Sequence, residues 1–175
     1  MQATRGASAV TRSRIYLRLV TVAGLTVIAD QVTKQLALDR LDRPVDLIEG
    51  LLTLRLTFNP GGAFGLFGGA SGFFLVASIL IIAIIVVWAG KLDEGRGVFP
   101  LGLILGGGIG NLVDRAVRDL GGRVVDFIDL HFWPVFNLAD SAIVLGVLTI
   151  LWTSFREQKP GDPSTQESAG SSVES

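Results

Sequence analysis

The sequence contains no cysteine and only one histidine, His131. Without cysteine the chain has no disulfide, no thiolate nucleophile and no Cys-ligated metal site. A single histidine cannot form a His-rich metal centre, so we interpret His131 as an ordinary loop residue and expect no metal and no cofactor. Charged residues make up only 18% of the chain, and a net charge of −1 gives no reason to expect nucleic acid as a partner.

Apolar residues are abundant instead: 49% of the 175 residues are hydrophobic and the mean hydropathy is +0.54. A helix needs about 20 apolar residues to cross about 30 Å of hydrocarbon. The sequence therefore predicts an α-helical membrane protein, with residues 15–156 forming one domain. Its four predicted transmembrane helices cover about 15–38, 72–90, 99–117 and 135–155.

The first predicted span follows several arginines, as a secretory signal would, but its apolar length is too great and no small-residue cleavage pattern ends it. We therefore interpret it as a membrane anchor. The third is rich in glycine, which permits close helix packing; no strand precedes it and the Rossmann spacing is absent, which excludes a dinucleotide site. Residues 1–14 and 157–175 are polar, and we expect disordered cytoplasmic tails there.

Four spans place both termini on one side of the membrane. Eight Lys and Arg residues lie on that side and six on the other, and these residues favour the cytoplasm. The two longer connections, between spans one and two and between spans three and four, are then outside. The unusual polar residues near the span ends should consequently gather at the outer membrane face.

Three pairs of these polar residues have helical spacing. Asp30 and Lys34 are i,i+4, so they share one helix face. The same holds for two i,i+3 pairs, Asn111 with Asp114 and Asn137 with Asp140. A charge at mid-bilayer costs about 2.5–3.5 kcal/mol. For Asp30–Lys34 and Asp114–Arg115, a structural pair that neutralises its own charge explains the residues as well as a functional role does.

Asp126 and Asp140 have no adjacent cation in the sequence and lie 14 residues apart, joined by one short loop. Intramembrane or interfacial carboxylates usually mark a functional site. Two close carboxyl groups resist double ionisation and share one proton, which is sufficient for acid/base hydrolysis of a peptide. We therefore expect a paired acid/base centre.

The segment of about 40–65 has a different period. Leu52, Leu54, Leu56 and Phe58 alternate with polar residues, which is typical of a half-buried strand. We expect a small extracytoplasmic sheet that ends in a turn at 59–65. Such a sheet is able to hold an extended peptide by edge pairing, although shielding of the site from solvent explains it equally well.

Five motifs between residues 30 and 140 resemble, in order, those of the lipoprotein signal peptidases, also called signal peptidase II. They are Asp30-Gln31-Val32-Thr33-Lys34, Asn59-Pro60-Gly61-Gly62-Ala63-Phe64, Gly110-Asn111-Leu112-Val113-Asp114-Arg115, Val124-Val125-Asp126-Phe127 and Phe136-Asn137-Leu138-Ala139-Asp140. Any one motif is weak, but the ordered set is highly specific. The two tails lie outside the resemblance.

The resemblance implies a multi-pass aspartyl endopeptidase of the bacterial inner membrane, with its active site at the extracytoplasmic face. It implies a diacylglyceryl-modified prolipoprotein as substrate, cut immediately before the lipidated cysteine. Asp126 and Asp140 match the catalytic pair. We expect contact with membrane lipids and a monomer. The matching supporting residues are Asp30, Lys34, Asn59, Gly110, Asn111, Asp114, Arg115 and Asn137.

Three other functions remain as alternatives. A small multi-pass ion or proton transporter component would explain polar residues at membrane depth, but a conduction path should continue through the inner halves of the spans, which are almost wholly apolar. A non-catalytic assembly factor would use the glycine-rich span as an oligomer contact. A metal-dependent hydrolase lacks suitable histidine spacing.

Overall fold

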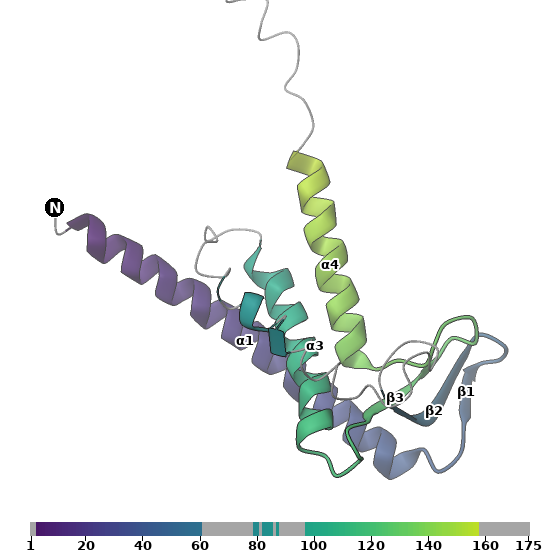
Figure 1. Ribbon diagram of the computed structural model, residues 1–175. Helices are drawn as coiled ribbons and strands as arrows, with labels where there is room; N and C mark the ends of the chain where they lie inside the picture. The colour runs from purple at the N-terminus through teal and green to yellow at the C-terminus, as the bar shows by residue number, and fades with distance from the viewer. Residues whose placement is uncertain (1–2, 61–78, 81, 86, 88–96, 158–175) are drawn as a thin grey trace, which may run out of the picture.

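The computed structural model describes residues 3–60, 79–80, 82–85, 87 and 97–157 (Figure 1). The second predicted span, 72–90, lies largely outside this part, although residues 79–80, 82–85 and 87 are helical. The elements are α1 (Ala3–Arg40), β1 (Val45–Ile48), β2 (Leu52–Asn59), α3 (Val98–Ala116), β3 (Val124–Asp129) and α4 (Leu138–Glu157).

Helix α3 packs against both α1 and α4, and glycine makes this close approach possible. A Cβ atom at Gly106 would lie 2.6 Å from the Cβ of Thr26, and one at Gly107 would collide with the carbonyl oxygen of Ala139. The packing role predicted for the glycine-rich segment is thus confirmed for the contacts of α3. Between the helices lies a small core of Ile15, Leu19, Ala23, Ile85, Val98 and Leu105.

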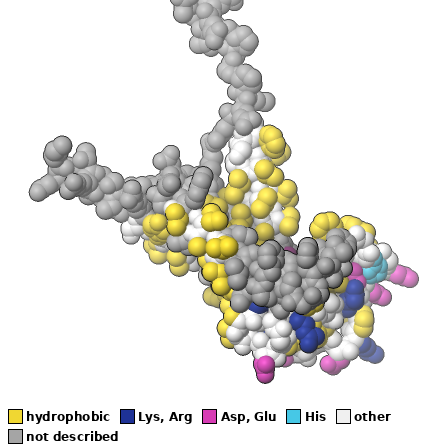
Figure 2. Space-filling model, in the orientation of Figure 1, with side chains coloured by type: hydrophobic (Ala, Val, Ile, Leu, Met, Phe, Trp, Pro, Cys, Tyr) yellow, Lys and Arg dark blue, Asp and Glu magenta, His cyan; other side chains and the backbone are white. Residues whose placement is uncertain are grey.

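The outer surfaces of the helices are apolar. On α4, large hydrophobic side chains such as Leu151, Trp152 and Phe155 are exposed, which is unusual on this scale for a protein surrounded by water. Figure 2 shows hydrophobic side chains over the visible helices, whereas charged ones gather at the sheet end. Among the described helices, Ser13–Arg40 and Leu138–Arg156 are long and apolar enough to cross a membrane.

The three strands form one antiparallel sheet in the order β1-β2-β3, at the C-terminal end of α1 (Figure 1). Strands β1 and β2 fall inside the predicted segment 40–65. Strand β3 differs from the prediction, because residues around Asp126 were expected to form an outer loop. Its β-branched and aromatic neighbours favour an extended backbone, and pairing with β2 satisfies the hydrogen bonds of that backbone.

A bulge in β2 sets which residues face Asp126. The register changes by one residue between the pair Leu54–Ile128 and the pair Thr57–Asp126. Residues directly opposite each other in an antiparallel pair point to the same face, and a slip of one residue exchanges the faces. The strict alternation predicted for β2 is therefore interrupted. Beyond the bulge, Thr57 and Asn59 share the face of Asp126, and Phe58 is exposed.

Two helix boundaries also differ from the prediction. Residues 3–14, expected to be a disordered tail, belong to α1, which begins at Ala3. They contain no proline, and extending an existing helix needs no new nucleation. The fourth predicted span starts later than expected, at Leu138, because Phe136 pairs with Ile128 of β3. Residues 158–175, the greater part of the other predicted tail, lie outside the described residues.

Candidate active site

Asp126 is buried on β3, with 1% of its surface exposed, and each of its carboxylate oxygens accepts a hydrogen bond. Oδ1 accepts from Nδ2 of Asn137 at 2.7 Å, and Oδ2 accepts from Nδ2 of Asn59 at 2.9 Å. Burial raises the pKa of Asp126 to about 7, and the nearby charge of Asp140 adds to this effect. The two amide hydrogen bonds act in the opposite direction because they stabilise the ionised form.

Asp140 lies in the first turn of α4, where a reciprocal pair of hydrogen bonds fixes the helix start. The backbone N–H of Asp140 donates to Oδ1 of Asn137 at 3.0 Å, and the backbone N–H of Asn137 donates to Oδ2 of Asp140 at 3.2 Å. This arrangement is a capping box in which an aspartate takes the third position. The other oxygen, Oδ1, accepts from Nδ2 of Asn111 at 2.8 Å. The local sequence that starts the helix thus also orients the carboxylate.

Two asparagines join the carboxylates into one network. The side chain of Asn137 binds Asp126 while its backbone binds Asp140. Asn137 Nδ2 also donates to Oδ1 of Asn111 at 3.1 Å, and the same oxygen accepts from Nζ of Lys34 at 3.0 Å. The two aspartates singled out from the sequence are therefore brought together, and the amide groups fix both orientations.

Asn111 also connects this network to an ion cluster in which Lys34 and two carboxylates are fully buried. Lys34 Nζ lies 2.9 Å from Oδ2 of Asp30 and 2.9 Å from Oδ2 of Asp114. With Asn111 as the third acceptor, every N–H of the ammonium group has a partner. Arg118 Nε lies 3.1 Å from Oδ1 of Asp114 and supplies a second positive charge. The Asp30–Lys34 pairing expected from helical spacing is confirmed, but it is half of a larger cluster in which charges balance.

The ion cluster also holds the two segments that carry the aspartates. Oδ1 of Asp30 accepts the backbone N–H of Ala139 at 3.0 Å, next to Asp140 at the start of α4. Oδ2 of Asp114 accepts the backbone N–H of Val125 at 3.0 Å, next to Asp126 on β3. One carboxylate from α1 and one from α3 thus fix the backbone beside each member of the pair.

Gly110 allows this cluster to form. A Cβ atom at this position would lie 2.5 Å from Oδ2 of Asp30, so a larger residue would push α1 away from α3. Gln31 Nε2 donates to Asp30, to the carbonyl oxygen of Gly110 and to Asp114, each at 3.1 Å. The sequence prediction missed Gln31 and Arg118 as members of the cluster. The i,i+4 spacing of Arg118 after Asp114 was the available signal.

Two further basic side chains, Arg115 and His131, lie in different surroundings. Arg115 Nη1 donates to the carbonyl oxygen of Asn111 at 3.3 Å, and its guanidinium interacts electrostatically with Asp140 and Asp126. His131 is exposed, and its ring Nε2 lies 2.8 Å from the hydroxyl of Thr53 in the sheet. It is a loop residue, as expected.

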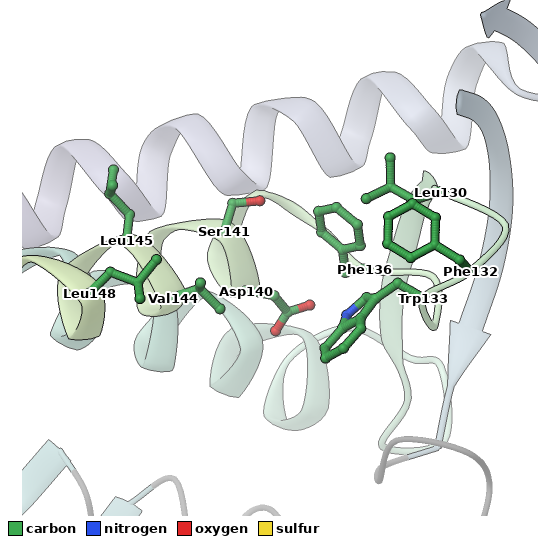
Figure 3. Close-up of a pocket in the computed structure, with 9 residues that line it drawn as sticks. All are labelled: Leu130, Phe132, Trp133, Phe136, Asp140, Ser141, Val144, Leu145 and Leu148. Atoms are coloured by element: carbon green, nitrogen blue, oxygen red, sulfur yellow. The ribbon is translucent and has the colours of Figure 1, made fainter. Parts of the chain in front are cut away.

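An apolar groove of about 420 Å³ opens beside Asp140. Figure 3 shows the Asp140 carboxylate between two groups of side chains, aliphatic ones on α4 and aromatic ones from the loop that follows β3. The groove joins the half-buried carboxylate of Asp140 to the exposed apolar surface of α4. It is lined by Leu130, Phe132, Trp133, Phe136, Asp140, Ser141, Val144, Leu145 and Leu148.

An apolar helical bundle with an amide-bound carboxylate pair at one end, buried at Asp126 and half-buried at Asp140, has the architecture of a membrane enzyme. A solved structure described as a bacterial membrane enzyme is similar, with a TM-score of 0.73 and 28% sequence identity, covering 83% of this chain and 92% of that one. The sequence profile of the family described as Signal peptidase (SPase) II matches residues 22–156.

Named relatives agree with the profile. A lipoprotein signal peptidase of Rhodococcus jostii is 40% identical over 140 residues, which cover 77% of this chain and 71% of the relative. One from Syntrophomonas wolfei is 44% identical over 133 residues, covering 73% of this chain and 85% of the relative. The chain belongs to the signal peptidase II family and is a membrane protease.

Proposed function

We propose that the chain removes signal peptides from lipoprotein precursors, with Asp126 and Asp140 as the catalytic carboxylates. The observation that carries the proposal is the amide network that holds both carboxylates while Asp126 is buried with a pKa of about 7. A pair of this kind retains one proton at neutral pH, which is the state needed for acid/base hydrolysis.

Hydrolysis then follows from the two protonation states. The ionised carboxylate takes a proton from water, and the oxygen of that water attacks the scissile carbonyl carbon. The protonated carboxyl group donates a hydrogen bond to the carbonyl oxygen. It later gives its proton to the nitrogen of the leaving amine. The shared proton belongs to the pair and is assigned to neither carboxyl group alone. The bond cut is the one before the lipidated cysteine.

The supporting residues have positioning roles in this proposal. Asn111 and Asn137 hold the carboxylates in register, and Asn59 stabilises the ionised form of Asp126. The ion cluster around Lys34 fixes the backbone on which both aspartates are mounted. Arg115 balances the negative charge of the pair through its electrostatic interaction with Asp140 and Asp126.

The proposal includes four spans of the bacterial inner membrane, at about 15–38, 72–90 and 99–117 and in α4, which begins at Leu138. The excess of Lys and Arg on the side of the termini favours cytoplasmic ends and an extracytoplasmic site. The enzyme acts as a monomer, in contact with lipid over the exposed apolar face of α4. Substrate enters sideways from the bilayer, because its acyl chains stay in the membrane.

The test uses purified protein and a diacylglyceryl-modified prolipoprotein. We expect Asp126→Asn and Asp140→Asn each to lower turnover at least about a hundredfold, the scale of general acid–base catalysis. Asp129→Asn is the matched control: it lies on the same strand, three residues from Asp126, and pairs with half-exposed Arg55 at the surface. It should keep turnover near the wild-type rate.

Thermal unfolding and gel-filtration profiles establish that each variant remains folded. Near-normal turnover by either folded variant of the catalytic pair rules out the mechanism. Loss of turnover by the Asp129 variant to the same extent would mean that the sheet, and not the carboxylate pair, is the sensitive element.

A further inference from the structure

The groove beside Asp140 has a neighbour of similar kind on the other side of α4. This second groove, of about 340 Å³, lies between α1, α3 and α4. Both grooves are lined by Ser141 and Leu145, which lie one turn apart on the same face of α4. These two residues therefore form a ridge that separates the grooves. The second groove is lined by Leu25, Thr26, Ala29, Leu103, Leu138, Ser141, Ala142 and Leu145.

The two grooves extend over the same depth of the membrane. Along α4, the first reaches from Asp140 to Leu148 and the second from Leu138 to Leu145. At 1.5 Å per residue these stretches are about 12 Å and about 10 Å long. Both fit within half of the roughly 30 Å hydrocarbon layer. The grooves thus match the depth of one leaflet, starting at the carboxylate pair.

Among the described residues, the lining of both grooves is almost entirely apolar, and its polar side chains are already hydrogen-bonded. The hydroxyl of Ser141 donates to the carbonyl oxygen of Asn137 at 3.0 Å, and that of Thr26 donates to the carbonyl oxygen of Val22 at 2.9 Å. An extended peptide backbone needs hydrogen-bond partners inside a membrane, and these grooves offer few. A hydrocarbon chain needs none.

We propose that the two grooves receive the two acyl chains of the lipid carried by the substrate, one chain on each side of the Ser141–Leu145 ridge. This inference rests on the proposed function, because it identifies the occupant from the site next to Asp140. The fork places the glycerol end of a two-chain lipid at Ser141, directly beside the catalytic carboxylate. The bond to be cut, close to the lipid attachment point, is then presented to the pair.

The grooves act by orientation more than by affinity. Lipid tails around the protein are as apolar as leucine, so moving an acyl chain from bilayer to groove yields little hydrophobic free energy. Holding both chains instead restricts the position of the scissile carbonyl, and small displacements of a reacting group cost up to about a hundredfold in rate. We therefore expect groove variants to change kcat more than KM.

The test blocks each groove separately. Val144→Trp fills the first, and Ala29→Trp fills the second; both positions are exposed, so the added ring has no packed core to displace. Val147→Trp on α4 and Ile28→Trp on α1 are the matched controls, because both residues are exposed and line neither groove. Substrates are one prolipoprotein peptide carrying either a two-chain or a one-chain lipid.

Each single groove variant should lower kcat for the two-chain substrate about tenfold and leave the one-chain substrate within about twofold. The one-chain lipid still has the unblocked groove. The double variant, Val144→Trp with Ala29→Trp, should slow both substrates, and the controls should slow neither. Equal slowing of both substrates by a single variant, or no slowing by any, overturns the fork.

A second measurement separates this inference from the proposed function. The Asp126→Asn protein is incubated with the two-chain peptide bearing a photoreactive group at the end of each acyl chain, and crosslinked residues are identified by mass spectrometry. Crosslinks on both sides of the ridge support the fork even if that variant cleaves normally. Crosslinks confined to one groove refute it. Equal labelling by a photoreactive phospholipid without peptide also refutes it, because ordinary bilayer lipid would then be the occupant.

Discussion

Removing the side-chain amide of Asn59 should raise the pH at which the enzyme loses activity. Asn59 Nδ2 donates to Oδ2 of Asp126 at 2.9 Å, and this bond favours the ionised carboxylate. Burial and the charge of Asp140 outweigh it, which leaves the pKa of Asp126 at about 7. Because the pair needs one proton, kcat/KM of the wild-type protein should fall as pH rises through about 7.

The size of the shift follows from the strength of one charge-assisted hydrogen bond. Such a bond contributes about 1.5–3 kcal/mol, and one pKa unit corresponds to about 1.36 kcal/mol. In Asn59→Ala the ionised form of Asp126 loses this stabilisation, so the proton is retained to higher pH. The midpoint of the alkaline limb should therefore move upward by about 1–2 units.

The assay is the pH profile of kcat/KM on a diacylglyceryl-modified prolipoprotein, scaled to the maximum of each variant. Thr53→Val serves as the control, because Thr53 lies on the same strand but binds Asp46 and His131 instead of Asp126. Its midpoint should match the wild type. A midpoint for Asn59→Ala that stays at the wild-type value or moves to lower pH refutes the reasoning.

Three further predictions concern stability, measured by thermal unfolding in detergent. Between pH 3.8 and about 7 the folded protein holds a proton on Asp126 that the unfolded chain releases. The free energy of unfolding should therefore fall by up to about 4 kcal/mol as pH rises across this window. Asp126→Asn should remove this part of the pH dependence. Gly110→Ala should destabilise by about 1–3 kcal/mol through its collision with a buried carboxylate. Gly108→Ala should be neutral or stabilising, because among the described residues its nearest neighbour is Ile82, at 3.6 Å. Lys34→Met should cost about 3–5 kcal/mol because it leaves one cation, Arg118, for two buried carboxylates and none beside Asp30. Arg55→Ala, which removes a 45%-exposed side chain from its ion pair with Asp129, should cost under about 1 kcal/mol.

The gathering of the polar residues at one end of the bundle was predictable from the sequence, because it depends on helix geometry and span direction. The spacing of Asp30 and Lys34, and of Asn137 and Asp140, fixes which side chains share a helix face. Alternating span directions then bring those faces to one end of the bundle. The sequence could not assign partners across helices: Lys34 binds two carboxylates from different helices, and no local spacing specifies the second.

The sheet was less predictable, because β-strand pairing depends on register between distant segments. Val124 and Val125 favour an extended backbone, but a strand of six residues needs a partner before it forms. That partner is β2, more than sixty residues earlier in the chain. Asp126 was accordingly expected in a loop. The proton it shares with Asp140 was expected from the sequence, but the strand that buries its side chain was not.

The bulge in β2 shows how much of the candidate site depends on one backbone residue. Without the change of register, the leucine before Thr57 would lie opposite Asp126, and the side chain of Asn59 would point to the other face of the sheet. Asp126 would then keep its burial and its repulsion from Asp140 but lose one of its two amide donors. Its pKa would then lie above 7, and the pair would keep its one proton to higher pH, the same direction as expected for Asn59→Ala. The alternation of leucines along β2 identifies a strand, but the bulge in the pairing of β2 with β3 sets which side chains contact Asp126 and thereby the pKa of that carboxyl group.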